Sequence, residues 1–500
     1  MSNVRVRIAP SPTGFLHVGT ARTALFNYLF AKKQGGKFIL RVEDTDLERS
    51  DKKYEKEIFD GLKWLGIEAD ESPEIGGRYV PYRQSERIAG YRKYIEKLLK
   101  DRKAFYCFHS EKDLESEKQW QTENKLPLLH LCKDWRDLSL KEANEKLLAG
   151  EQAIIRFKNP LDRADHLKTF YDIIRHQVHF FVRLLGDFSI AKSLDVPLYN
   201  FAVVIDDYEM QISHVIRGED HIPNTPKQLL IAEALGWTKE NKDGIGDMQP
   251  PWQYAHLPLI LGPDRSKLSK RHGATSINEY KEQGYLPEAL FNFMALLGWN
   301  PGDNREIFSK DELIKEFSLE KIHKSGAIFD IAKLDWMNGE YIRKKSVAEL
   351  TGLCKPYLEN FLQFSIFNFQ FSKEYIEKII ALEQPRLKKL FEIGGKTDYF
   401  FKPPVYDKEL LRWKNMSDEE VKISLEQSEK IISNFQLTTS KEKLEGVFFA
   451  EIGAGDKGQI LWPLRVALTG KKASPGPFEI IEILGKEKTL QRILTAKEII

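Results

Sequence analysis

The fold of this 500-residue chain is decided by the stretch Val4-Arg-Val-Arg-Ile-Ala-Pro-Ser-Pro-Thr-Gly-Phe-Leu-His-Val-Gly19 and by Lys37-Phe-Ile-Leu-Arg-Val-Glu-Asp-Thr-Asp46, which follows it. The first five residues alternate apolar and charged side chains, a pattern typical of a strand, and the Pro/Gly-rich run 10–14 predicts a loop. Apolar residues at helical spacing from Ala21 to Leu29 predict a helix that ends at Gly35-Gly36. The β-prone run at 37–42 predicts a second strand. Strand, helix and strand in this order indicate a parallel α/β sheet.

In open parallel sheets a ligand lies beyond the carboxyl ends of the strands. Residues 9–19 and 43–46 both follow strands, so we expect these two segments to meet there. Further strands are predicted at Phe201–Ile205 and His214–Arg217, whereas the mixed, charged segment before them indicates an insertion. From about residue 331 onward, long stretches without Gly or Pro predict helices, for example 373–382 and 418–434.

Composition excludes several classes of protein. Apolar residues make up 42% and charged residues 30%, which predicts a folded globular chain and not a disordered one. The formal net charge is only +2, so charge alone gives no argument for nucleic acid. Three cysteines are too few for a disulfide framework. There is no signal-peptide core and no run near the ~18 apolar residues that span a bilayer, so we expect a cytoplasmic protein and no membrane partner.

Two motifs suit a polyphosphate. His17 stands at the start of the predicted helix, where backbone N–H groups and the helix dipole favour phosphate, and Gly14 and Gly19 allow close approach of the backbone. The loop Lys267-Leu-Ser-Lys-Arg271 supplies three cationic side chains in a Gly/Pro/Ser frame. Taken one by one, each motif also fits an ordinary surface turn or a solvated basic loop.

Together the two motifs resemble, in the expected order, the signatures of class I aminoacyl-tRNA synthetases. His17-Val-Gly-Thr20 is similar to the H-I-G-H tetrapeptide, with Thr in its last position, and Lys267–Arg271 is similar to the K-M-S-K-S loop, with Leu268 for Met and Arg271 for Ser. Residues 7–28 look like the bacterial glutamyl-tRNA synthetase form. The resemblance implies ATP with Mg²⁺ as a substrate, His17 and Lys270 as catalytic residues, and an ATP site formed by Thr13, His17, Gly19, Lys267 and Lys270.

The same resemblance implies a pocket for L-glutamate, lined by Arg7, Ala9, Ser11, Glu43, Tyr199 and Arg217. A carboxylate side chain calls for a guanidinium, which can bind it through two hydrogen bonds. We expect Arg7 and Tyr199 to hold the side-chain carboxylate, Arg217 to contact a substrate carboxylate, and Glu43 to accept from the α-ammonium. Which arginine meets which carboxylate stays open, and an arbitrary arginine at a strand end is often simply solvated.

The resemblance covers essentially the whole chain. It implies an α/β fold, with a Rossmann-like parallel-sheet catalytic domain that contains an insertion and is followed by an all-α C-terminal anticodon-binding region. The expected boundaries are 1–84 and 198–275 for the catalytic domain, 85–197 for an acceptor-stem-binding insertion, 276–340 for a stem-contact region and 341–500 for the anticodon-binding region.

The implied activity is that of a monomeric glutamate–tRNA ligase acting on tRNA-Glu. The alternatives are an enzyme that also glutamylates tRNA-Gln and a non-catalytic tRNA-binding homologue; the latter would be expected to lack His17, Lys270 or Glu43, and all three are present. A glutaminyl enzyme has a β-rich anticodon-binding part. The helical pattern of the last third of this chain disfavours that alternative. A short paralogue that modifies a tRNA base lacks that third, and a generic nucleotidyltransferase would not need the pocket for an acidic substrate.

Some members of the family carry zinc in the insertion, bound by a C-x-C pair and a later C-x-H or similar pair. Here Cys107, His109, His130 and Cys132 offer four suitable ligand types. His109 stands where a cysteine is expected, however, and Asp134 stands where the last ligand would fall. We therefore expect no structural zinc and no metal-binding residues.

Overall fold

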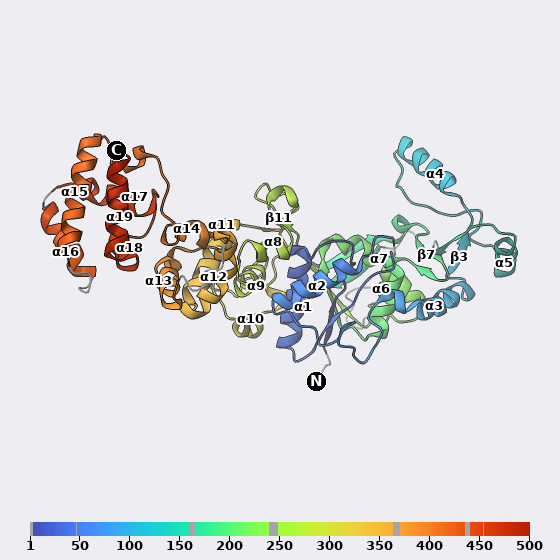
Figure 1. Ribbon diagram of the computed structural model, residues 1–500. Coiled ribbons are helices and arrows are strands. Elements are labelled where there is room, and N and C mark those ends of the chain that lie inside the picture. The colour runs from blue at the N-terminus through green and yellow to red at the C-terminus, as the bar shows by residue number, and fades with distance from the viewer. Residues whose placement is uncertain are drawn as a thin grey trace. The chain divides into compact units, whose positions relative to one another are not determined.

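The computed structural model describes residues 4–46, 48–160, 167–239, 249–363, 371–435, 441–453 and 455–500, and the side chain of Lys270 lies outside this description (Figure 1). The chain divides into two compact units. The first comprises Met1–Tyr280 and Leu290–Asp330, and the second comprises Lys281–Ala289 and Ile331–Ile500.

The first unit is built on a six-stranded sheet whose strand order is β2-β1-β9-β10-β5-β6. All neighbouring strands are parallel except β5 and β6, which form an antiparallel hairpin. The strands are β1 (Arg5–Ile8), β2 (Lys37–Leu40), β5 (Leu167–Asp172), β6 (His176–Phe181), β9 (His214–Gly218) and β10 (Gln253–Leu257). The expected α/β fold with a parallel sheet is confirmed.

Helix α1 (Val18–Lys33) connects β1 to β2 and packs against both strands and β9. Its apolar residues are buried almost all round, as expected for a helix covered by a sheet on one side and by further elements on the other. The helix is followed by Gly35, whose φ of +62° favours glycine, and by Gly36, where a Cβ would lie 2.3 Å from the carbonyl oxygen of Val4. The glycine pair therefore lets the chain turn directly into β2.

The charged residues of β1 are buried, and both of its arginines form ion pairs inside the protein. The Arg5 guanidinium donates to Glu71 at 2.7 and 2.9 Å, and Arg7 donates to Asp207 at 3.0 and 3.1 Å. Both arginines have only 4% of their surface exposed. The alternation therefore reflects a strand covered on both faces, one of them by ion pairs.

The segment Phe201–Ile205, expected to be a strand, lies instead in helix α6 (Tyr199–Glu209), so that prediction was wrong. The helix buries every residue from Phe201 to Asp207, and no polar residue interrupts the apolar run to reveal the 3.6-residue period. When a short buried helix consists of apolar, β-branched residues without periodicity, its sequence cannot be distinguished from that of a buried strand. His214–Arg217, by contrast, does form a strand, β9.

The chain between β2 and β9 also forms a separate antiparallel sheet, with the order β3-β4-β7-β8. Its strands are β3 (Ala104–Cys107), β4 (Ile154–Phe157), β7 (Ser189–Ser193) and β8 (Val196–Pro197). The hairpin β5–β6 comes from the same part of the sequence but extends the central sheet. The expected insertion thus contributes to two different sheets.

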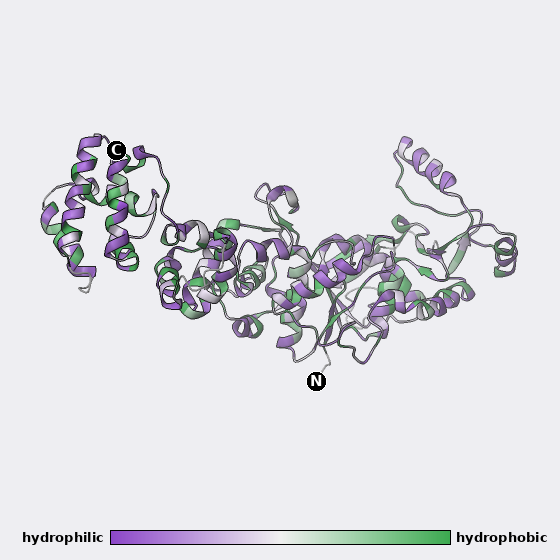
Figure 2. Ribbon diagram, in the orientation of Figure 1, coloured by the Kyte–Doolittle hydropathy of each residue, from purple (hydrophilic) through white to green (hydrophobic). Residues whose placement is uncertain are grey.

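The other α-helices of the first unit are labelled in Figure 1. They are α2 (Lys52–Trp64), α3 (Ile88–Lys100), α4 (Glu111–Glu123), α5 (Leu140–Leu148), α7 (Thr225–Ala234) and α10 (Lys310–Glu316). Helix α4 is hydrophilic almost throughout (Figure 2), and Gln121 is its one buried residue. Two helices contribute residues to both units, α8 (Ile277–Glu282) and α9 (Pro287–Ala295), and a short parallel pair joins β11 (Ile260–Leu261) to β12 (Ala327–Ile328).

The described part of the second unit contains helices and no strand, as expected from the sequence. These helices are α11 (Ile331–Lys344), α12 (Val347–Leu362), α13 (Lys373–Glu383), α14 (Glu392–Thr397), α15 (Asp418–Asn434), α16 (Lys441–Ile452), α17 (Lys457–Thr469), α18 (Pro477–Leu484) and α19 (Lys486–Glu498). Ser346, Ser372 and Ser417 start three of them by accepting a hydrogen bond from the amide three residues onward. Buried apolar residues from α13, α15, α17, α18 and α19 pack together in the larger of its cores.

Among the described helices of both units, none is both long enough and apolar enough to cross a membrane.

Candidate active site

A pocket of about 660 Å³ opens at the carboxyl ends of β1, β2 and β9. The loops after β1 and β2 meet there, because the Glu43 amide donates to the Pro10 carbonyl at 3.1 Å. The lining includes all six residues expected to bind glutamate and three of those expected to bind ATP, namely Arg7, Ala9, Ser11, Glu43, Tyr199, Arg217, His17, Gly19 and Lys267. Two motifs far apart in the sequence, at residues 7–19 and near 267, thus line one cavity.

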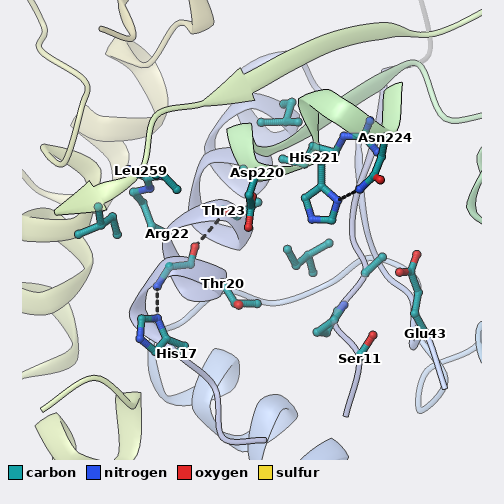
Figure 3. A pocket seen from close by; sticks show the side chains of 18 of the residues that line it. Ser11, His17, Thr20, Arg22, Thr23, Glu43, Asp220, His221, Asn224 and Leu259 are labelled. Atoms are coloured by element: carbon teal, nitrogen blue, oxygen red, sulfur yellow. Dashed lines mark hydrogen bonds between the residues drawn. The ribbon is translucent and has the colours of Figure 1, made fainter. Parts of the chain in front are cut away.

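His17 caps helix α1 at one end of this pocket. Its Nδ1 accepts a hydrogen bond from the Gly19 amide at 3.0 Å (Figure 3), so in the neutral ring the hydrogen is on Nε2. Burial first, and the nearby Lys267 second, lower the pKa of His17 and favour this neutral form. His17 can therefore donate one hydrogen bond from Nε2 while it holds the first turn of the helix in place.

The first turn of α1 offers fewer free amides than expected, because Val18 donates to the Thr275 carbonyl at 2.9 Å and Gly19 donates to His17. What remains for a phosphate is the helix dipole, the donor on His17 and Thr20, which also lines the pocket. Thr20 points into the cavity between His17 and Glu43 in Figure 3.

The basic loop is braced by an aspartate. Asp264 accepts from the backbone and hydroxyl of Ser266 at 2.9 and 2.7 Å and pairs with Arg271 at 3.2 Å. Hydrogen bonds from Ser266 lower the pKa of Asp264 below its usual range. Lys267 lies 3.6 Å from Asp220. Lys270 begins the short 3₁₀ helix Lys270–His272, and its side chain lies outside the described part of the structure.

Thr13 is the one described residue of the expected ATP site that the structure places elsewhere. It is exposed and does not line the pocket. Its amide donates to the Ser11 carbonyl at 2.8 Å, which tightens the turn that carries Ser11 into the pocket wall.

Arg7 enters the pocket already paired. Its Nε and Nη2 both donate to Asp207, and the described residues give no partner to Nη1. Asp207 also accepts from Arg41 at 2.8 Å, and Arg41 in turn donates to Glu43 at 3.1 Å. Burial alone would lower the pKa of Arg41, but the charges of Asp207, Asp206 and Glu43 raise it. Glu43, whose pKa burial raises despite Arg41, is thereby held at the pocket wall.

Arg217 is held by neutral partners. Its Nε donates to His256 at 3.1 Å and its Nη2 donates to the Thr225 hydroxyl at 2.8 Å, while Nη1 is buried and has no partner among the described residues. Tyr199, the other expected carboxylate ligand, has its hydroxyl 2.9 Å from His221 Nδ1. Burial first, and Arg217 second, lower the pKa of His221 to about 4.

Known proteins resemble this chain over its full length. Residues 3–336 match the family model "tRNA synthetases class I (E and Q), catalytic domain", and residues 349–497 match "Anticodon binding domain". Glutamate–tRNA ligase 2 of Caldicellulosiruptor saccharolyticus is 45% identical over 495 residues, which cover 98% of both chains. The chain belongs to the glutamate–tRNA ligase family of class I aminoacyl-tRNA synthetases. Glutamate–tRNA ligase 1 of Syntrophomonas wolfei is also 45% identical, over all of this chain and 97% of its own length.

Solved structures of glutamate–tRNA ligases have the same fold as this family member. A crystal structure from Elizabethkingia meningosepticum, in complex with its amino acid, has a TM-score of 0.87 at 36% identity and covers 99% of both chains. One from Elizabethkingia anophelis has a TM-score of 0.85 at 36% identity and covers 99% of this chain and all of its own.

Several groups in and behind the pocket of this glutamate–tRNA ligase family member were not predicted from the sequence. Asp207 accepts from both Arg7 and Arg41, and His256 and Thr225 accept from Arg217. His221 lies four residues after Arg217, and Arg22 lies two residues after the first signature, so a signal existed for those two. Nothing in the local sequence distinguishes Asp207 from its neighbour Asp206, and His256 lies among mostly apolar residues.

The four possible zinc ligands come together in the insertion. Their ligand atoms all lie within 4.8 Å of one another. Cys107 Sγ is 3.3 Å from His109 Nδ1 and 3.7 Å from His130 Nε2, and Cys132 Sγ is 3.8 Å from His109 Nδ1. A tetrahedral zinc with ordinary bond lengths requires ligand separations of about 3.3–3.8 Å. The spacing argument against zinc is therefore not supported by this geometry.

Carboxylates support both histidines from behind. His130 Nδ1 lies 2.5 Å from Glu117 of helix α4, and His109 Nε2 lies 2.9 Å from Asp134. Such carboxylate partners fix the ring that ligates a metal. Cys132 first, and then the two histidines, lower the pKa of the Cys107 thiol despite its burial, and the thiolate is the form that binds metal. Asp134, expected to replace the last ligand, lies behind a ligand instead.

Proposed function

We propose that this protein activates L-glutamate with ATP and transfers the glutamyl group to the 3′ end of tRNA-Glu. The observation that carries this proposal is a single pocket, in which a cationic phosphate end meets two arginines that each keep a guanidinium nitrogen free for substrate. The phosphate end consists of His17, Lys267 and the start of α1.

In the first step an oxygen of the α-carboxylate attacks the α-phosphorus of ATP, which enters as its Mg²⁺ complex, and pyrophosphate leaves. His17 donates from Nε2 to a phosphate oxygen, and the Lys267–Arg271 loop neutralises the departing pyrophosphate, with Lys270 as the residue that the family motif assigns to it. Catalysis rests on positioning and charge stabilisation, so no acid–base pair is needed.

In the second step a hydroxyl of the tRNA terminal ribose attacks the carbonyl carbon of the glutamyl-adenylate. The C–O bond to AMP breaks, AMP carries away the electron pair, and the hydroxyl proton passes to the leaving phosphate. Glu43 accepts from the α-ammonium throughout; Arg7, Tyr199 and Arg217 hold both carboxylates before activation and the side-chain carboxylate after it. The helical region matched by the anticodon-domain model is where the far end of the tRNA would bind. We expect the enzyme to work as a monomer in the cytoplasm.

Selectivity follows from the arginines. Glutamine would replace the side-chain carboxylate by a neutral amide, so the free guanidinium nitrogen that faces it would lose a charged acceptor, a loss of about 2–5 kcal/mol. Aspartate is one methylene shorter and loses about 1–3 kcal/mol. Ala9 and Ser11 are small side chains on the same wall, which leaves room for the longer substrate.

The test is aminoacylation with purified tRNA-Glu and tRNA-Gln in parallel, with ATP and each of glutamate, glutamine and aspartate. We expect glutamate on tRNA-Glu and little charging with the other two amino acids. Equal charging of tRNA-Gln with glutamate would identify the non-discriminating enzyme. Binding of tRNA without any charging would identify the non-catalytic homologue and refute the proposal.

We also propose, against the expectation from the sequence, that Cys107, His109, His130 and Cys132 hold one structural zinc. Two observations support this proposal: the distances between the ligand atoms match those of a tetrahedral zinc site, and each histidine has a carboxylate behind it. The site would tie β3 to the segment that carries His130 and, through Glu117, to the hydrophilic helix α4.

Elemental analysis of the purified protein should find about one zinc per chain. The double variant Cys107→Ser with Cys132→Ser should lose the metal and become sensitive to protease in the insertion, because a structural zinc contributes directly to folding. Cys354→Ser, which changes a buried cysteine far from the cluster in sequence, is the matched control and should keep the metal. Wild-type protein that contains no zinc after purification and zinc addition would refute this proposal.

A further inference from the structure

A chain of buried hydrogen bonds runs behind the pocket and ends at Arg217. Arg217 Nε donates to His256 Nε2 at 3.1 Å, and His256 Nδ1 lies 2.6 Å from Asp172 Oδ2. Asp172 and His256 have no exposed surface, and Arg217 has 5%. The three residues come from β5, β10 and β9, which are neighbours in the central sheet.

The donors in this chain can be assigned from chemistry. A guanidinium nitrogen only donates, so His256 Nε2 must accept and the ring hydrogen must be on Nδ1, which donates to Asp172. Asp172 also accepts from the backbone amides of His256, Ile174 and Arg175 at 2.9, 2.9 and 2.8 Å. Four donors thus surround one carboxylate, which fixes both its orientation and the tautomer of His256.

The result is an arginine with one free nitrogen. His256 occupies Nε and the Thr225 hydroxyl occupies Nη2, whereas Nη1 is buried and finds no partner among the described residues. Thr225 is able to accept because its own hydroxyl hydrogen can go to the His221 carbonyl at 3.2 Å. A buried N–H without a partner is costly, so Nη1 is directed at a ligand.

Because the direct partners of Arg217 are neutral, they do not cancel its positive charge. Burial first, and the charge of Arg217 as well, lower the pKa of His256 to about 4 despite Asp172, so the ring stays neutral near pH 7. Arg7 differs, because Asp207 places a full negative charge on the same two guanidinium positions. Asp172 orients Arg217 only through a neutral ring and does not pair with it.

We propose that Asp172, His256 and Thr225 are positioning residues that hold the Arg217 guanidinium with Nη1 toward a carboxylate of the substrate. The inference rests on the proposed glutamate-activating function and adds three residues to it. None of the three lies in a signature motif, and Asp172 lies within the segment expected to be an insertion.

Two substitutions of His256 separate positioning from packing. The Oε1 of glutamine can stand near the place of His256 Nε2 and accept from Arg217, whereas the Nδ2 of asparagine stands near Nδ1 and can only satisfy Asp172. If His256 positions Arg217, His256→Asn should raise the KM for glutamate roughly 10- to 100-fold, the loss expected for a hydrogen bond to a charged group. His256→Gln should raise it several-fold less, and the KM for ATP should change little in both.

The variants are assayed as full-length chains by aminoacylation at saturating tRNA, with thermal melting as a check of folding. A purely structural His256 predicts the reverse order, because asparagine keeps Asp172 satisfied and glutamine does not; that order, or equal KM values, would overturn the proposal. If neither variant folds, Thr225→Val and Thr225→Ser decide the point. Valine should raise the KM for glutamate and serine should not, and an unchanged KM in the valine variant would overturn it. Absence of charging by the wild-type protein would refute the proposed function instead.

Discussion

Arg7 is the residue at which stability and selectivity can be separated most sharply. Its Nε and Nη2 are bound to Asp207, so only Nη1 and the second hydrogen on Nη2 remain for a substrate carboxylate. Arg7→Ala removes both functions at once. It leaves the Asp207 carboxylate buried with Arg41 as its remaining cationic partner, at 2.8 Å.

The expected loss of selectivity follows from this geometry. A hydrogen bond to a charged group contributes about 1.5–3 kcal/mol, so the preference for glutamate over glutamine should fall roughly 10- to 150-fold. Stability should fall as well, by about 1–3 kcal/mol, because Asp207 loses two hydrogen bonds in a buried position. The two effects are independent, since selectivity is a ratio measured on the folded fraction.

The assay is competition between labelled glutamate and glutamine in aminoacylation, together with urea unfolding. Adding Asp207→Asn to Arg7→Ala removes the buried charge that has lost one of its two cationic partners, so the double variant should regain part of the stability but not the selectivity. If Arg7→Ala kept the wild-type ratio for glutamate over glutamine, another residue would read the side chain. If selectivity returned in the double variant, Arg7 would act only through Asp207.

The phosphate end of the pocket and the buried His256 carry further expectations. Lys270→Ala should slow adenylate formation ~10²–10³-fold with little change in glutamate binding, and an unchanged single-turnover rate would mean that the loop is misassigned. His17→Ala should lose both the phosphate donor and the N-cap of α1, and the loss of the cap should lower stability by about 0.5–2 kcal/mol. His17→Asn should keep the cap and still slow adenylate formation. Equal rates for His17→Asn and wild type would contradict a role of His17 in catalysis. The pKa of His256 is about 4 in the folded protein, below about 6.5 for an unfolded chain, so the unfolded state binds more protons between these values. Stability should therefore fall as the pH drops from about 6.5 to about 4, by up to ~3 kcal/mol, and urea unfolding of His256→Gln should show a smaller fall than wild type.

The strand–helix–strand unit at the N-terminus could be predicted because its signals are local. Alternation marks β1, helical spacing marks α1, and the Gly35-Gly36 pair marks the return of the chain to β2. Helix α6 could not be recognised, because burial on all sides removes the polar residues that reveal a period. The same burial hid the direction of Arg5 and Arg7, which pair inside the protein.

The residues that line the site could be named from motifs, but the residues that orient them could not. Arg7 and Arg217 belong to runs similar to a known family, whereas Asp207 and Asp172 lie outside these runs. Their importance depends on which strands become neighbours, and no short-range pattern carries that information. The four possible zinc ligands illustrate the same limit, because their spacing along the chain does not show that their ligand atoms lie within 4.8 Å of one another.

The carboxylates near the pocket are distributed unevenly, so its two sides differ in electrostatic character. Around Arg7, Arg41 and Arg87 three carboxylates, Asp206, Asp207 and Glu43, balance the positive charge, and Glu43 reaches the pocket wall. Around Arg217 the direct partners are neutral, so its charge is offset only at a distance. We therefore expect an amino acid with two carboxylates and one ammonium to meet Glu43 as an acceptor at one side and Arg217, a cation without a carboxylate partner in the described part of the chain, at the other. Reversing the substrate would place its ammonium against Arg217, so we expect this repulsion to favour a single orientation for attack on ATP.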